Sequence, residues 1–149
     1  MKSVAIGCDP NASDLKNVVI EKLRALGYEV KDYGSEDPIY ANVAIEVAER
    51  VAAGDHDRGI LICGTGIGVS IAANKVPGAY AALCSDAYSA ERARASNNAN
   101  IMCMGAQVLG HKVAEVLVER WMGADFDPQG RSGPKVQRIC DYEASGAAK

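Results

Sequence analysis

The stretch GILICGTGIGVS, residues 59–70, decides the fold class of this chain. It begins with a continuous apolar run that ends in Cys63, as is typical of a buried β-strand. Glycines then alternate with other residues at Gly64, Gly66 and Gly68, and a short apolar segment follows. A buried strand, a glycine loop and a helix in this order predict one β-loop-α unit of an α/β protein.

The same alternation of strand and helix extends in both directions from this unit. Strands are predicted in SVAIGCD, YEVKDYG, RGILIC, AYAALC and NIMCMG. Helices are predicted over 13–27, 40–54, 68–76, 85–99, 110–123 and 135–143, with Ser13 or Asn11 capping the first and Ser85 the fourth. Right-handed βαβ connections then give one Rossmann-like three-layer α/β/α domain over residues 1–149, with a five-stranded parallel sheet and a tail over 124–149.

Composition excludes several classes of function. Apolar residues make up 48% of the 149 residues, charged residues 23% and aromatic residues 5%, and the formal net charge is -3. This balance argues against a nucleic-acid partner, which calls for a basic stripe or stacking aromatic residues. No apolar run reaches the roughly 18 residues of a membrane span, and no signal peptide is recognisable. We therefore expect a cytoplasmic protein without a membrane partner.

The cysteines and histidines do not suggest a metal site. The five cysteines are widely spaced without a C-x-x-C pair, which predicts free thiols and no metal. Cys8, Cys84 and Cys103 lie in apolar strands and are interpreted as core residues. His56 lies in a polar turn and is expected to face solvent, while His111 begins a helix.

The glycine loop is suited to holding an anion, because its backbone N–H groups can approach a ligand closely. It lacks the sixth-position glycine of a dinucleotide fingerprint, where Val69 stands, and it has no Gly-Lys-Ser/Thr of a P-loop. Cys63 at the start of the loop would have a lowered pKa and could act as a base near neutral pH. That arrangement suits proton abstraction next to a carbonyl, although Cys63 could equally be another buried strand thiol.

The whole pattern resembles the type B ribose-5-phosphate isomerase and galactose-6-phosphate isomerase family. The motifs that carry the resemblance are GCD, ICGTGIGVSIAANKVPG, SAERARASNNAN and GRSGPKV. The resemblance implies a sugar-phosphate isomerase that works through a cis-enediol without a metal or organic cofactor. It also implies a homodimer or tetramer, and we expect the tail over 124–149 to pack at the dimer interface.

The resemblance also implies the roles of individual residues. Cys63 would be the base that moves a proton between C1 and C2, and the Thr65 hydroxyl would assist transfer between the two oxygens. The remaining expected contacts are the loop backbone at Gly64, Gly66, Ile67 and Gly68, the sugar ligands Asp9 and Asn97, and the phosphate ligands Arg131 and Lys135. The run from Glu91 to Arg94 is interpreted as a solvated helix face rather than a phosphate site, and Tyr40 as either a sugar contact or a packing residue.

Three positions depart from the family pattern. Pro10 and Ser96 stand where the ribose enzymes usually have histidines, and Gln107 stands at a phosphate-binding arginine position. Without a ring-opening histidine, the chain is similar to the branch that interconverts D-erythrulose 4-phosphate and D-erythrose 4-phosphate, whose substrates cannot close a furanose ring. The alternatives are a ribose 5-phosphate isomerase in which Ser96 or water opens the ring, and a non-catalytic partner subunit. A nucleotide-binding module and a signalling receiver domain fit the loop less well.

Overall fold

The computed structural model describes residues 3–146 and contains a parallel sheet in the order β2-β1-β3-β5-β4. The strands are β1 (Ser3–Cys8), β2 (Glu29–Asp32), β3 (Arg58–Cys63), β4 (Ala81–Leu83) and β5 (Ile101–Gly105). In this sheet β2 lies on one side of β1, and β3, β5 and β4 follow in that spatial order on the other side. The carboxyl ends of β1 and β3 therefore flank the switch point, where ligands bind in sheets of this kind.

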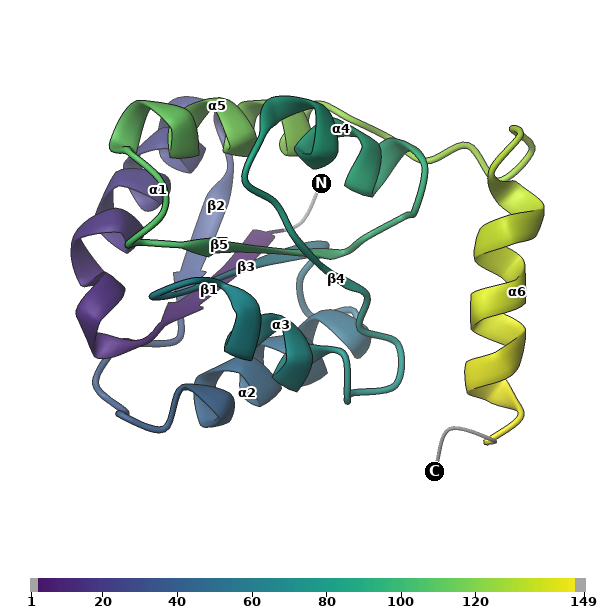
Figure 1. Cartoon of the computed structure of the whole chain (residues 1–149), viewed down its shortest axis with the longest axis horizontal. Helices are drawn as coiled ribbons and strands as arrows, with labels where there is room; N and C mark the ends of the chain where they lie inside the picture. Colours follow the sequence, from purple (N-terminus) through teal and green to yellow (C-terminus); the bar gives the residue numbers. More distant parts are fainter. Residues whose placement is uncertain (1–2, 147–149) are drawn as a thin grey trace.

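The helices cover both faces of the sheet. They are α1 (Ser13–Ala25), α2 (Tyr40–Ala52), α3 (Ile67–Ala73), α4 (Ala87–Ala95), α5 (His111–Met122) and α6 (Gly133–Ala144), with a 3-10 turn η1 at Pro10–Ala12. Figure 1 shows α1, α4 and α5 on one face and α2 and α3 on the other, while α6 stands beside this body. The predicted α/β class, five-stranded parallel sheet and three layers are confirmed.

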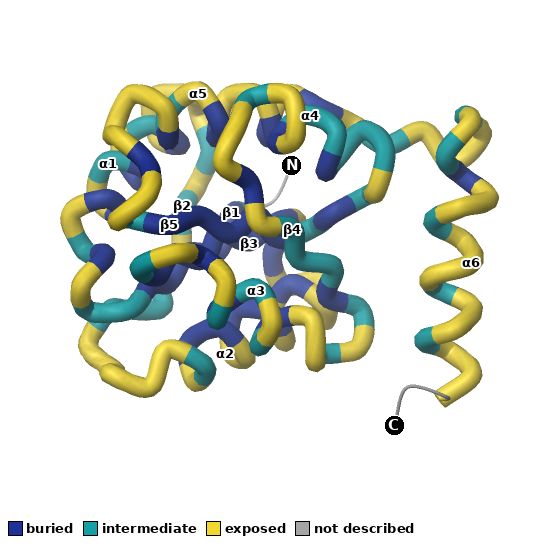
Figure 2. Tube along the Cα trace, in the orientation of Figure 1, coloured by how far each residue is buried: buried dark blue, intermediate teal, exposed yellow. Residues whose placement is uncertain are grey.

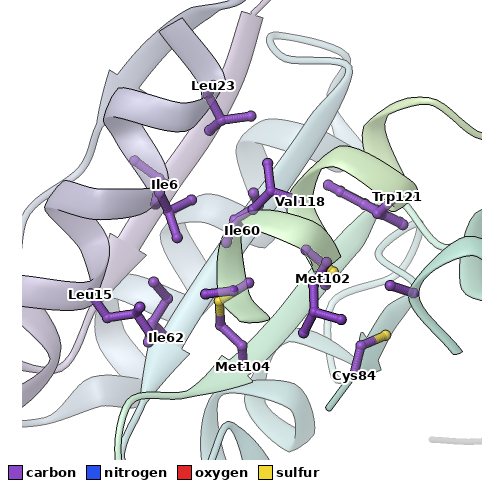
Figure 3. Close-up of a cluster of buried hydrophobic side chains, with 14 of the residues drawn as sticks. Ile6, Leu15, Leu23, Ile60, Ile62, Cys84, Met102, Met104, Val118 and Trp121 are labelled. Carbon is purple, nitrogen blue, oxygen red and sulfur yellow. The ribbon is translucent and has the colours of Figure 1, made fainter. Parts of the chain in front are cut away.

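Side chains of the central strands alternate between two buried clusters, as the period of a β-strand requires. Ile60 and Ile62 of β3 face the cluster formed with α1, α4 and α5, which Figure 3 shows together with Trp121. Leu61 and Cys63 point the other way, into the cluster formed with α2 and α3. The register of β3 thus directs Cys63 toward the glycine loop and α3.

The predicted helix caps are wrong in two places. Ala12 occupies the N-cap position of α1 without a capping side chain, because the turn η1 leads directly into the helix. Ser13 is already helical, and its hydroxyl donates to the carbonyl oxygen of Pro10 at 2.9 Å. Asp86, rather than Ser85, caps α4 by accepting a 2.7 Å hydrogen bond from the Ser89 N–H.

His56 is buried rather than solvated, at 8% exposure. Its Nδ1 lies 2.5 Å from the Ser3 hydroxyl and its Nε2 lies 2.7 Å from the Tyr33 hydroxyl. Burial lowers the pKa of His56 below its ordinary value of 6.5, and the nearby cation Arg50 lowers it further, whereas Asp55 opposes both effects. Two strands distant in sequence thus bury a histidine that its own neighbours would leave in water.

The tail ends in a longer helix than the sequence predicts, because α6 begins at Gly133 rather than at Lys135. Figure 2 shows that most of α6 is exposed or half-buried. Side chains of α6 that connect it to the body include Cys140, whose Sγ accepts a hydrogen bond from the Tyr80 hydroxyl at 3.5 Å, and Glu143. The Glu143 carboxylate accepts hydrogen bonds from the Gly78 N–H at 3.1 Å and from the Tyr80 hydroxyl at 2.5 Å.

Within residues 3–146, no helix is long and apolar enough to cross a membrane. The same part of the chain contains no group of three or more histidine, cysteine or acidic residues arranged to hold a metal ion.

Candidate active site

Cys63 lies at the carboxyl end of β3, under the turn of the glycine loop. It is 6% exposed, and its Sγ accepts a hydrogen bond from the Gly66 N–H at 3.1 Å. Gly66 makes this turn possible, because its φ of 82° is unfavourable for other residues and a Cβ there would lie 2.8 Å from the backbone carbon of Met104. A hydrogen-bond donor directed at the sulfur stabilises the thiolate, the form in which cysteine acts as a base.

The loop offers further donors beside the sulfur. The Thr65 Oγ1 accepts a hydrogen bond from the Ile67 N–H at 3.2 Å, which leaves the O–H of Thr65 free to donate to a ligand. Within residues 3–146, the N–H groups of Gly64, Thr65 and Gly68 have no hydrogen-bond acceptor. These donors can hold an anionic oxygen next to Cys63, as an enediolate requires.

Two side chains from other elements border the loop. The Tyr40 ring, at the start of α2, lies so close to Gly68 that a Cβ there would be 2.4 Å from the Tyr40 hydroxyl. The Gln107 amide, which follows β5, lies over Gly64, and a Cβ at Gly64 would be 3.5 Å from it. Tyr40 therefore packs on the loop itself, and Gln107 occupies the space over Gly64 where the family pattern places an arginine.

Asp9 approaches the same end of the sheet from β1. Its backbone N–H donates to the Ile62 carbonyl oxygen at 2.9 Å, so Asp9 lies next to the strand end that carries Cys63. The structure thus brings together Asp9, Cys63, Thr65 and the loop backbone from Gly64 to Gly68, as the sequence predicts.

The other predicted residues lie at the opposite end of the strands. Ser96, Asn97 and Arg131 line one open cavity of about 680 Å³, and Lys135 follows in the first turn of α6. This cavity is next to the amino end of β3, because Asn100, a few residues after Asn97, accepts a hydrogen bond from the Gly59 N–H at 2.9 Å. Figure 1 shows α3 and the glycine loop well away from α6. One chain therefore does not bring these two groups of residues together.

Arg92, which lies in the run interpreted as a solvated helix face, lines the same cavity. Its Nε donates to the Ser96 Oγ at 2.8 Å. The two residues are four positions apart on the predicted helix, so their spacing was the signal that could have found this pair. The interpretation of the run from Glu91 to Arg94 as a solvated face agrees with the 43% exposure of the Arg92 side chain. It is wrong for Arg94, whose guanidinium turns inward and donates to the Ala99 carbonyl oxygen at 3.3 Å.

The remaining strand cysteines are structural, as predicted. Cys8, Cys84 and Cys103 are buried. Burial raises the pKa of Cys8 and of Cys84 to about 11, and it raises the pKa of Cys103 as well. These thiols stay protonated near neutral pH, which distinguishes them in function from a thiol that must act as a base.

Comparison with known proteins identifies the family. The family model described as Ribose/Galactose Isomerase matches residues 4–139. The chain belongs to this family. It is 48% identical over 147 residues to the D-erythrulose-4-phosphate isomerase of Pectobacterium atrosepticum, covering 96% of each chain. It is 42% identical to the ribose-5-phosphate isomerase B of Escherichia coli, covering 96% of this chain and 97% of the other.

Among solved structures, the ribose-5-phosphate isomerase B of Clostridium thermocellum superposes with a TM-score of 0.91 at 41% identity, covering 99% of this chain and 100% of the other. This member of the ribose/galactose isomerase family is therefore an enzyme, a sugar-phosphate isomerase. The resemblance stated from the sequence motifs is confirmed. The roles of individual site residues remain predictions, and the geometry described above constrains them.

Proposed function

We propose that this enzyme interconverts D-erythrulose 4-phosphate and D-erythrose 4-phosphate through a cis-enediolate. The observation that carries the proposal is the environment of Ser96. Its oxygen already accepts a hydrogen bond from Arg92, and none of the described residues that line its cavity is a histidine. A guanidinium remains protonated at any pH of interest, so this pair offers no group that titrates near neutral pH.

The chemistry of the substrates gives this observation its meaning. Ribose 5-phosphate closes a furanose ring through O4, and an enzyme acting on it needs an acid–base group to open that ring. In a four-carbon 4-phosphate, O4 carries the phosphate and cannot close the ring. A site without a ring-opening base therefore suits the open-chain substrate, in agreement with the 48% identity to a D-erythrulose-4-phosphate isomerase.

In the proposed reaction, the Cys63 thiolate removes a proton from one of the two reacting carbons and returns it to the other. The N–H groups of Gly64, Thr65 and Gly68 stabilise the negative charge that develops on the substrate oxygens. The free O–H of Thr65 assists proton transfer between these oxygens. The Gly66 N–H donates a hydrogen bond to the Cys63 sulfur at 3.1 Å and so holds it in place beside the loop.

We further propose that the complete site forms between two copies of the chain in a homodimer. Asp9 and Cys63 of one copy would face Asn97, Arg131 and Lys135 of the other. The separation of these groups at opposite ends of β3 supports this arrangement, because neither group alone can hold both ends of a sugar phosphate. Within residues 3–146, no carboxylate forms an ion pair with Arg131 or Lys135, so both cations are available for a phosphate.

The exposed apolar residues of the tail support the same dimer. Ile139 and Tyr142 of α6 are 52% and 47% exposed, although helices normally bury such residues. A second copy would cover them and would place the start of α6, with Arg131 and Lys135, next to the glycine loop. The tail over 124–149 would then form part of the dimer interface.

A panel of tetrose, pentose and hexose phosphates assayed with the purified chain tests the substrate. We expect kcat/KM for D-erythrulose 4-phosphate to exceed that for ribose 5-phosphate by at least about tenfold. Equal or faster turnover of ribose 5-phosphate would refute the tetrose assignment in favour of a ribose 5-phosphate isomerase. A folded chain that turns over none of these compounds by itself would instead indicate the non-catalytic partner subunit.

A further inference from the structure

Arg92 and Arg94 occupy two different environments, although they are separated by one residue on α4. Arg94 turns toward the core, where burial lowers the pKa of its guanidinium. Arg92 projects into the cavity at the amino end of the strands, which Arg131 also lines, and its side chain is 43% exposed. Arg92 therefore points toward a space that a ligand can enter, whereas Arg94 serves the fold.

The contact between Arg92 and Ser96 leaves each side chain with specific hydrogen-bonding capacity. Arg92 uses its Nε to hold the Ser96 oxygen at 2.8 Å. Ser96 keeps its own O–H, so it can donate to a ligand oxygen. The guanidinium keeps the N–H groups of its two terminal nitrogens, which form the fork that matches a phosphate.

Neighbouring carboxylates leave most of this fork available. The Nη1 of Arg92 is 4.0 Å from the Glu91 carboxylate, which Arg120 also approaches to 3.4 Å. Asp127 also lines the cavity, but its Oδ1 accepts a hydrogen bond from the Gln129 N–H at 2.9 Å. Two guanidinium groups and one carboxylate give the cavity a net positive charge, which suits a phosphate dianion.

We propose that Arg92 determines the specificity of this isomerase for a four-carbon substrate by binding its phosphate together with Arg131. The proposal rests on the proposed function, which supplies the tetrose phosphate. The phosphate of a four-carbon substrate lies one carbon–carbon bond closer to the reacting carbons than that of a pentose phosphate. Arg92 holds the Ser96 oxygen, and Asn97 next to Ser96 is expected to bind the sugar, so Arg92 places a cation at the sugar end of this cavity, where the phosphate of a shorter substrate would lie.

Steady-state kinetics of Arg92→Leu, Arg92→Lys and wild type would test the proposal. We expect Arg92→Leu to raise KM for D-erythrulose 4-phosphate by about 10-fold or more, because it removes a charged hydrogen bond to the phosphate, while kcat changes much less. KM for ribose 5-phosphate should change less, so the ratio of the two kcat/KM values should fall. Arg92→Lys should recover part of the loss, because it keeps the charge without the fork.

Inhibition by inorganic phosphate provides a second readout, whichever sugar phosphate the wild type prefers. The Ki of phosphate should rise in Arg92→Leu and stay at the wild-type value in Arg24→Leu, which removes an exposed arginine of α1. Melting temperatures of the variants would exclude a folding defect. An unchanged Ki, or equal losses of kcat/KM on both substrates, would overturn the role of Arg92. A wild-type preference for ribose 5-phosphate would instead refute the proposed function, and the Ki would still report whether Arg92 binds phosphate.

Discussion

The glycine loop and the cavity around Arg92 lie at opposite ends of the same strands, and they are held in place in different ways. The loop follows directly from the buried strand β3 and is covered by Tyr40 and by Met104 of β5. The cavity is formed by the last turn of α4 and by the segment that leads into α6, which is largely exposed (Figure 2). Cys63, the group proposed to perform proton transfer, thus lies in the core. Arg131 and Lys135, which are expected to bind the phosphate, lie in an exposed segment at the start of α6.

This contrast implies that substitutions at the two ends should separate kcat from KM, and the largest effect is expected at the loop. Cys63→Ala should reduce kcat by about 10³-fold, because it removes the proposed general base while the loop donors remain. The matched control, Cys103→Ala, removes a buried thiol from the neighbouring strand and should keep kcat within about threefold of wild type. Retention of full activity by Cys63→Ala would contradict the assigned mechanism.

The same variant tests whether the two ends belong to one site. Assayed near the wild-type KM, where a raised KM also removes most of the rate, homodimers of Cys63→Ala and of Arg131→Ala should each be nearly inactive. After unfolding and refolding as an equal mixture, half of the dimers contain one chain of each kind, and one of their two sites is intact. Activity should then return to about a quarter of the wild-type value. If a mixture that is shown to contain mixed dimers recovers no activity, a site shared between copies is excluded.

An intermediate effect is expected at the contact that holds the tail. Glu143→Ala removes the carboxylate that binds the Gly78 N–H and the Tyr80 hydroxyl. Because this contact orients α6, we expect KM to rise by about tenfold while kcat changes by less than about threefold. Asp141→Ala, which alters an exposed pair with Gln137 on the same helix, is the control and should leave both constants unchanged. A fall in kcat as large as the rise in KM would mean that α6 also positions the reacting groups.

The smallest effect concerns stability and involves neither region. Because the pKa of His56 is lowered in the folded state, the unfolded chain takes up a proton more readily as the pH falls below about 6.5. The free energy of unfolding should therefore decline from pH 7 to pH 5. In His56→Gln this part of the decline should be lost, so its melting temperature should fall by about 2 °C less than that of wild type. Parallel pH profiles for the two proteins would contradict this origin of the pH dependence.

The sequence predicted the fold and the loop correctly because both depend on local patterns. Apolar runs bounded by glycines marked the strands, and the position of Cys63 at the end of such a run placed it beside the loop. The environment of His56 was not predictable in this way, because Ser3 and Tyr33 approach it from distant strands. The different orientations of Arg92 and Arg94 were not predicted, because arginines and alanines alternate on α4 and the pattern does not indicate which arginine faces the core.

The separation of the two halves of the site follows from the direction of α4, which runs back across the sheet after β4. Asn97 therefore lies at the amino end of the strands, although the resemblance to the family groups it with Asp9 and Cys63. The resemblance to the family supplied these residues as one set. Only the path of the chain shows that a single copy distributes them over two ends.

Arg58 gives β3 a second task, because the strand begins with this residue and ends with Cys63. The Arg58 guanidinium stacks over the Trp121 ring at 5.4 Å and donates to the carbonyl oxygens of Trp121 at 2.6 Å and Ala124 at 2.9 Å. These carbonyls lie where α5 ends and the tail leaves the body. The strand from Arg58 to Cys63, about 17 Å long, therefore fixes the spacing between the Cys63 thiol and the first residues of the tail. In a homodimer, the length of β3 in each copy would then determine the separation between Cys63 and the residues expected to bind the phosphate.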